Sequence, residues 1–341
     1  MSLAGSSDVR GALASAPGGK VTPPRRARRG SGRRVKRWNV DRVTLFIVFL
    51  GLPLAIFLIF VISPFIQAAW YALTNFGGFS PTYQFTGPAN FIKLLGDHNV
   101  LNAFLNNVIL ALVVPIVTIA IALAFASAVT VAGPSIGPIR GIRGSSFYRV
   151  VSFFPYVIPA IIIGIVWSGV LDPSHGILNA VLTSLGLPFD DFAWLGDPAT
   201  ARASLIFVMV WAFVGFYMVL FVASIKSVPA EIYEAARLDG ASRWRMTFSI
   251  TIPQIRDSIQ TAYVYLGITA LDAYVYAQGL TTSGPATTQV VPQKILLNLF
   301  HNGQAGYASA IGVASALVTL LFALVVFSIA RAARGRDEGR A

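Results

Sequence analysis

The chain has 341 residues, of which 55% are hydrophobic and 12% are charged, and its formal net charge is +12. A soluble globular domain carries about 25% charged residues, so this chain cannot cover a water-facing surface in the usual way. It has no cysteine, which excludes disulfides, thiol nucleophiles, thiolate metal sites and iron–sulfur clusters.

The chain opens with a basic segment. Residues 1–40 are rich in Gly, Ser, Pro and Arg, so we expect a disordered cytoplasmic tail there. Its arginine cluster comprises Arg25, Arg26, Arg28, Arg29, Arg33 and Arg34. Nucleic acid could bind such a cluster, but a signal that orients the following apolar run and touches acidic lipid headgroups explains it better. We therefore expect membrane lipid as its partner, and no nucleic acid.

Six apolar runs follow, each near the roughly 20 residues that cross about 30 Å of hydrocarbon. They cover residues 43–70, 108–131, 150–171, 203–225, 258–280 and 307–329. Because lipid cannot satisfy backbone amides, all six are expected to be helices, although the fifth is the least apolar and holds Asp272. The sequence thus predicts an all-α integral membrane protein with about six transmembrane helices over residues 41–331, and a short tail over residues 332–341.

Lysine and arginine are distributed very unevenly between the two sides of these runs. If the tail is cytoplasmic, the segments on that side hold 23 of the 26 basic residues, and the opposite loops hold only Lys93, Arg202 and Lys294. Basic residues accumulate on the cytoplasmic side of membrane proteins. We therefore expect a multi-pass protein of the bacterial cytoplasmic membrane with both termini in the cytoplasm.

Motifs for covalent chemistry are missing. Gly-Lys occurs once, at Gly19-Lys20, without the residues of a phosphate-binding loop. The three histidines, His98, His175 and His301, fall in three different loops and lack metal-ligand spacing. No Gly-x-Ser-x-Gly motif accompanies a Ser/His/Asp set. We expect no metal, no bound cofactor and no enzymatic activity in this chain.

The loop between the fourth and fifth runs, residues 226–257, divides into two short helices. Pro229 suits a helix start and Glu231 its first turn, while Gly240 suits the left-handed residue that ends a helix. Ser242 can cap a second helix, and Pro253 stands near the start of the fifth run. An ordinary amphipathic linker would also give such helices, so the residue pattern has to separate the two interpretations.

That pattern is Glu234-Ala235-Ala236, three residues, Gly240, nine residues and Ile250-x-Ile252-Pro253. It resembles the cytoplasmic loop motif of ABC importer permeases, which usually have Leu at the position of Ile252. Stretches such as 85–91 (FTGPANF), 153–159 (FFPYVIP) and 306–310 (GYASA) resemble the carbohydrate-uptake branch of that family. The resemblance covers about residues 60–331.

The resemblance implies a type I ABC importer permease fold and a four-part assembly. A second permease subunit would share the translocation pathway, two ATPase subunits would hold ATP and Mg, and an extracellular sugar-binding protein would deliver a mono- or oligosaccharide. The loop would dock on an ATPase as a coupling helix. The residues expected to couple to the ATPase are Glu231, Glu234, Ala235, Ala236, Asp239, Gly240 and Pro253.

A polar stripe in the fifth run is a candidate sugar path. Tyr265, Thr269, Asp272 and Tyr276 would share one face of a continuous helix, and Trp211 and Tyr217 in the fourth run could assist. Sugars need acceptors for hydroxyls and aromatic faces for C–H surfaces. Asp272 could equally bond the partner permease.

Two other functions remain open on the sequence alone. In an ion-coupled secondary transporter Asp272 would be the coupling group, but no inverted repeat is visible. A membrane enzyme would need the catalytic set that the sequence lacks.

Overall fold

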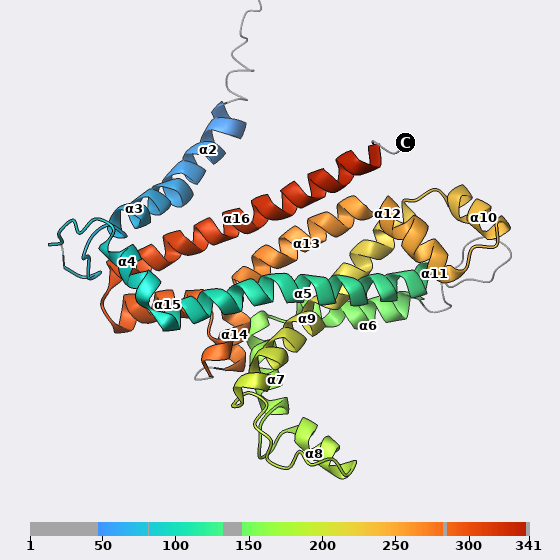
Figure 1. Cartoon of the computed structure of the whole chain (residues 1–341), viewed down its shortest axis with the longest axis horizontal. Helices are drawn as coiled ribbons and strands as arrows, with labels where there is room; N and C mark the ends of the chain where they lie inside the picture. The colour runs from blue at the N-terminus through green and yellow to red at the C-terminus, as the bar shows by residue number, and fades with distance from the viewer. Residues whose placement is uncertain (1–46, 81, 132–144, 282–284, 339–341) are drawn as a thin grey trace, which may run out of the picture. The chain divides into compact units, whose positions relative to one another are not determined.

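The computed structural model describes residues 47–80, 82–131, 145–281 and 285–338 (Figure 1). Within these ranges the regular structure is helical, apart from one isolated antiparallel bridge between Thr74 and Phe85. The predicted tail, residues 1–40, and its arginine cluster lie outside the described residues. The chain divides into two units, with the boundary in the sequence between Phe57 and Leu58.

The first unit contains η1 (Ile47–Gly51) and α2 (Leu52–Phe57). The elements of the second unit are η2 (Leu58–Ile62), α3 (Ser63–Tyr71), α4 (Ala89–Gly96), α5 (His98–Val131), α6 (Ser145–Val157), α7 (Ala160–Val170), α8 (Ile177–Ser184), α9 (Pro198–Lys226), α10 (Ala230–Leu238), α11 (Arg243–Met246), η3 (Thr247–Thr251), α12 (Ile252–Gln254), α13 (Arg256–Leu271), α14 (Tyr274–Leu280), η4 (Ala286–Thr288), α15 (Val291–Leu296), η5 (Leu297–His301) and α16 (Ala305–Glu338).

Four helical stretches of the described chain are long and apolar enough to cross a membrane: Ile47–Tyr71, His98–Thr130, Pro198–Lys226 and Ala305–Ala332. The pair Phe147–Val157 and Ala160–Val170 makes a fifth if it is counted as one span. The protein is therefore a multi-pass membrane protein. The remaining predicted span, 258–280, is present as α13 and α14.

Two predicted spans are broken where continuous helices were expected. The pair α6 and α7 bends by 97° at Ile158 and Pro159, because the proline ring disfavours helical geometry in the residue before it. Asp272, with φ −108° and ψ 50°, separates α13 from α14. Single unbroken helices over 150–171 and 258–280 were thus wrong.

The core of the second unit forms around α9, which packs against α5 and α6, while α13 lies along α5 (Figure 1). Tyr217, Phe221, Leu205 and Met209 of α9 are buried there. The helices α7 and α14 approach closely at Gly164 and Gly279. A Cβ on Gly164 would lie 2.8 Å from Gly279 Cα, so only glycine allows this contact.

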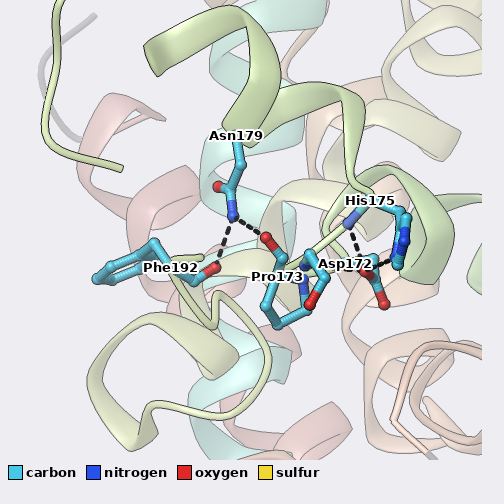
Figure 2. Close-up of polar contacts among 6 residues, drawn as sticks. Asp172, Pro173, His175, Asn179 and Phe192 are labelled. Atoms are coloured by element: carbon cyan, nitrogen blue, oxygen red, sulfur yellow. Dashed lines mark hydrogen bonds and ion pairs between the residues drawn. The ribbon is translucent and has the colours of Figure 1, made fainter. Parts of the chain in front are cut away.

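Asn179 of α8 fastens the loop between α7 and α9. Its side-chain amide donates to the carbonyls of Pro173 (2.9 Å) and Phe192 (3.0 Å), as Figure 2 shows, and its Oδ1 accepts from Trp194 Nε1 (2.6 Å). Nearby, the Asp172 carboxylate accepts the backbone N–H of His175, which holds the pKa of Asp172 below its usual value. The loop therefore has a defined conformation.

The three basic residues predicted for the outer loops all bond within the chain. Lys93 Nζ donates to Gln304 (2.6 Å) and lies 4.1 Å from the centroid of the Tyr307 ring. Arg202 donates to Asn106 (2.9 Å). Lys294 donates to Gln289 and is buried, which lowers the pKa of its ammonium group, while the charge of Asp97 acts in the opposite direction.

Candidate functional site

The loop over residues 226–257 forms the two predicted short helices, α10 and α11. Pro229 precedes α10 in an extended conformation, and Glu231 lies in the first turn. Ser242 Oγ accepts the N–H of Arg245 at 3.3 Å, so it caps α11 as predicted. Local sequence rules thus describe this loop correctly.

Gly240 ends α10 in the left-handed region, with φ of +75°. The N–H of Ala241 donates to the carbonyl of Ala236 (2.9 Å), and the N–H of Gly240 donates to that of Arg237 (3.0 Å). These two bonds define a Schellman motif, which satisfies the last carbonyls of the helix. The motif fixes the direction in which the chain leaves α10.

One side of α10 is fastened to the protein and the other faces outward. Tyr233 is buried, and its hydroxyl hydrogen-bonds to that of Thr251 at 3.1 Å. The opposite side carries four exposed residues, which we call the coupling face: Glu231, Glu234, Ala235 and Leu238. Leu238 is 90% exposed, which is unusual for a leucine on a helix that is otherwise anchored.

The remaining predicted coupling residues occupy different surroundings. Asp239 and Gly240 are exposed beside the coupling face, whereas Ala236 is partly buried and packs against the chain's own core. Pro253 is exposed in the first turn of α12, away from α10 in the sequence. Only Ala235 of the two alanines is therefore open to another surface.

A groove of about 790 Å³ lies between α6, α9 and α13, and we call it the tyrosine groove. Tyr156, Tyr217 and Tyr265 line it together with Asp257 and hydroxyls. The serine pair Ser224 and Ser258 is linked by a 3.0 Å hydrogen bond. Aromatic rings beside hydroxyls are the chemistry that a sugar surface requires, since rings contact its C–H faces and hydroxyls exchange hydrogen bonds.

Sequence reasoning predicted Tyr217 and Tyr265 for such a path but missed Tyr156, Ser224, Ser258 and Thr261. Asp257, Thr261 and Tyr265 are spaced by four residues, so the helical periodicity that gave the predicted stripe could also have extended it toward the start of α13. Tyr156 packs flat on Phe216, with ring centroids 4.5 Å apart. No local pattern predicts that contact, because it joins α6 to α9.

The predicted stripe does not form one continuous face. Tyr265 and Thr269 lie on α13, and Thr269 Oγ1 donates to the carbonyl of Tyr265 (2.9 Å). Asp272 stands in the break and is exposed, and its carboxylate makes no hydrogen bond or ion pair with any described residue, although its backbone N–H still bonds to α13. Tyr276 lies beyond the break on α14 and packs against Phe213, with centroids 5.6 Å apart.

Trp211 joins a different aromatic group. Its ring meets the edge of Trp167 at a centroid distance of 5.4 Å, and Trp167 in turn meets Phe207 at 5.1 Å. None of these three rings lines the tyrosine groove. Trp211 therefore lies outside the groove that Tyr217 and Tyr265 line.

Two buried asparagines of α5 hold the broken span in place. Asn107 Nδ2 donates to the carbonyl of Leu271, the last residue of α13, and its Oδ1 accepts the N–H of Val291 (3.1 Å). Asn106 Nδ2 donates to the carbonyl of Gln289 (2.9 Å). The asparagine pair thus ties the break before Asp272 to the start of α15.

Among the described residues, no group of three or more His, Asp or Glu side chains is arranged to hold a metal ion.

Comparison with known proteins gives a consistent picture. The family model for the binding-protein-dependent transport system inner membrane component matches residues 129–336. The chain is 53% identical to the diacetylchitobiose uptake system permease protein NgcF of Streptomyces coelicolor, over 92% of this chain and 90% of that protein. It is 33% identical to the probable ABC transporter permease protein YurN of Bacillus subtilis, over 80% and 91% of the two chains.

A solved structure shares the fold. A chain of a bacterial ABC transporter involved in the import of the acidic polysaccharide alginate aligns with a TM-score of 0.70 at 25% identity, covering 86% of this chain and 96% of that one. The family match spans more than half of the sequence and includes the loop motif, the tyrosine groove and the broken fifth span. The chain therefore belongs to the inner membrane components of binding-protein-dependent transport systems, the ABC importer permeases.

Proposed function

We propose that this chain is one of two permease subunits of an ATP-driven importer that takes up an oligosaccharide delivered by an extracellular binding protein. The 53% identity with a diacetylchitobiose uptake permease over 92% of the chain carries this proposal. The tyrosine groove supports it chemically, since its three tyrosines and its serine and threonine hydroxyls suit a neutral sugar.

The substrate class follows from the same relative. Diacetylchitobiose is a disaccharide whose acetamido groups add hydrogen-bond donors and acceptors to the sugar hydroxyls. Ser224, Ser258 and Thr261 offer matching hydroxyls in the groove, and Tyr156, Tyr217 and Tyr265 offer aromatic surface. We therefore propose a chito-oligosaccharide as the first substrate to test, with Asp272 further along the same pathway.

The coupling face would be the surface that docks on an ATPase subunit. Its exposed carboxylates, Glu231 and Glu234, flank the small Ala235, and the 90% exposed Leu238 gives an apolar contact for another protein. Two separate ATPase subunits would hold ATP and Mg and receive this face, one on each permease. ATP-driven closure of the ATPases would then switch the pathway between its two openings.

This arrangement requires the coupling loop to be cytoplasmic. The 23 to 3 distribution of basic residues supports that orientation, with both termini inside and the α7–α9 loop outside. It also supports the division into a cytoplasmic tail over 1–40, a permease domain over 41–331 and a second tail over 332–341. In the structure α16 continues to Glu338, so the last span leads directly into the second tail.

The test is ATP hydrolysis by the purified complex of this permease, its partner permease and the ATPases, reconstituted in lipid with the binding protein. We expect diacetylchitobiose to stimulate hydrolysis and maltose to leave it near its basal rate. Equal stimulation by both sugars would overturn the substrate class. Failure of the chain to purify with any ATPase would overturn the proposed function itself.

A further inference from the structure

A second groove lies between α5 and the coupling loop, with a volume of about 690 Å³, and we call it the α5–α11 groove. Ile116, Ile119 and Leu123 of α5 line one side, and Trp244 and Phe248 line the other. The rings of Trp244 and Phe248 stack at a centroid distance of 5.7 Å and are both exposed. The groove is therefore a long apolar surface that this chain leaves uncovered.

Two polar residues of the groove lining carry side-chain groups without a partner. Arg243 is exposed, and its guanidinium has no hydrogen-bond or ion-pair partner among the described residues. Ser127 also lines the groove, and its hydroxyl is buried without a hydrogen-bond partner in the described chain. Buried polar groups are normally satisfied, so an unpaired hydroxyl and an unpaired guanidinium in the lining of one groove indicate a molecule that completes the site.

The dimensions of the groove match one leaflet of a bilayer. The twelve residues from Ile116 to Ser127 on α5 span about 17 Å of helix, and half of the hydrocarbon core is about 15 Å thick. The polar end belongs to α11 and to the last turns of α5, and the apolar end lies nearer the middle of α5. Trp244 stands at the polar end, where tryptophan is enriched in membrane proteins.

We propose that the α5–α11 groove binds one anionic phospholipid of the inner leaflet, with its phosphate on Arg243 and an acyl chain along Ile116, Ile119 and Leu123. The inner-leaflet placement rests on the proposed cytoplasmic position of the coupling loop. A cation at the rim and an apolar floor fit a lipid better than a transmembrane helix, which would leave the guanidinium without an anion. The soluble alternative, inorganic phosphate, would use Arg243 but not the apolar floor.

Such a lipid would affect how ATP hydrolysis is coupled to uptake. Arg243 and Trp244 belong to α11, which follows the Schellman turn at Gly240, and Phe248 and Ile252 lead into α13. The lipid would therefore brace the segment that joins the coupling face to the tyrosine groove. We expect ATP hydrolysis to be better coupled to uptake in bilayers that contain anionic lipid.

The test measures lipid retained by the purified complex. The complex is reconstituted in nanodiscs of phosphatidylcholine with phosphatidylglycerol, extracted in mild detergent, and the phospholipid bound to it is counted by native mass spectrometry. We expect Arg243→Gln to retain about fivefold less phosphatidylglycerol, as follows from the contribution of one basic residue near an anionic surface. The matched control is Arg245→Gln, since Arg245 is exposed on the same helix but does not line the groove.

A second variant keeps the test decisive if Arg243→Gln does not assemble. Ala124→Trp fills the groove, because Ala124 lines it and is exposed. We expect this variant to assemble, to lose the retained phosphatidylglycerol, and to be insensitive to added inorganic phosphate.

Three results would overturn the proposal. One is equal retention by Arg243→Gln and Arg245→Gln, and another is displacement of the lipid by inorganic phosphate. The third is loss of the second permease from Ala124→Trp, which would assign the groove to a helix of that subunit. None of these readouts uses sugar or transport, so the proposal can fail while the proposed function stands.

Discussion

Gly240 combines an unusual backbone conformation with a position beside the proposed ATPase contact. Its φ of +75° lies in the left-handed region, and nothing in the described chain lies within 4 Å of the position that a Cβ would take. A side chain is therefore opposed by backbone strain alone, which costs roughly 1–2 kcal/mol and more for a β-branched residue.

We predict that Gly240→Val disrupts the turn after α10 and lowers ATP-driven uptake, while the complex still reaches the membrane. Gly240→Asn is the matched control, since asparagine tolerates the left-handed region. The measurements are uptake and the amount of ATPase that purifies with each variant. Normal uptake and tight ATPase binding by the valine variant would remove this turn from the coupling contact.

Substitutions of Asp272 and Tyr276 can test whether these two residues line the proposed sugar path. A break in a transmembrane helix is tolerated where the backbone is buried in protein or lines a water-filled cavity. Asp272 stands in such a break, exposed and with a carboxylate that has no partner in the described chain, which favours a cavity.

We predict that Asp272→Asn and Tyr276→Ala lower sugar uptake and change its apparent affinity, with the complex intact. Size-exclusion chromatography checks assembly, and uptake at several sugar concentrations gives the affinity. Loss of assembly in Asp272→Asn would instead make this carboxylate a contact with the partner permease.

At the scale of elements, the sequence predicts short-range structure well and helix breaks poorly. The start of α10, the cap at Ser242 and the end at Gly240 follow from rules that involve neighbouring residues. The break at Asp272 is tied to Asn107, which is more than 160 positions away, donates to the carbonyl of Leu271 before the break and accepts the N–H of Val291 at the start of α15. The hydrophobic pattern of residues 258–280 cannot indicate a contact with Asn107, which lies on another helix, so a continuous helix was expected.

Asn107 therefore offers a test of the broken span. Its removal leaves the carbonyl of Leu271 and the N–H of Val291 unpaired in a buried site, and each unsatisfied group costs about 1–3 kcal/mol. We predict that Asn107→Ala lowers the melting temperature of the purified complex.

The matched control for that experiment is Asn99→Ala, because Asn99 is an exposed residue of the same helix. A melting temperature for Asn107→Ala equal to that of Asn99→Ala would show that the asparagine does not hold the break.

At the scale of the whole molecule, orientation decides whether the coupling face can reach an ATPase. The chain has no cysteine, so single cysteines report on sidedness without background. We predict that an impermeant thiol reagent labels Ser174→Cys, on the exposed turn before α8, in intact cells. Ser242→Cys, which is also exposed, should react only after the membrane is permeabilised. Labelling of Ser242→Cys in intact cells would reverse the topology.

The family, the membrane character and the two short helices of the loop over residues 226–257 could be predicted from the sequence, because each has a signal in composition or in a short motif. The tyrosine groove could be predicted only in part, since Tyr156, Tyr217 and Tyr265 come from three helices that no local pattern brings together. The α5–α11 groove could not be predicted, because it depends on which side chains the packing of α5 against the coupling loop leaves uncovered.

The most direct test of the central claim is the energy source of uptake. Proteoliposomes that contain the complete complex are loaded with ATP and Mg, and the binding protein and labelled diacetylchitobiose are added outside. We predict accumulation of the sugar against its gradient with ATP inside, and none with a proton or sodium gradient alone. Accumulation driven by an ion gradient in liposomes that hold only this chain would contradict the account and make the protein a secondary transporter.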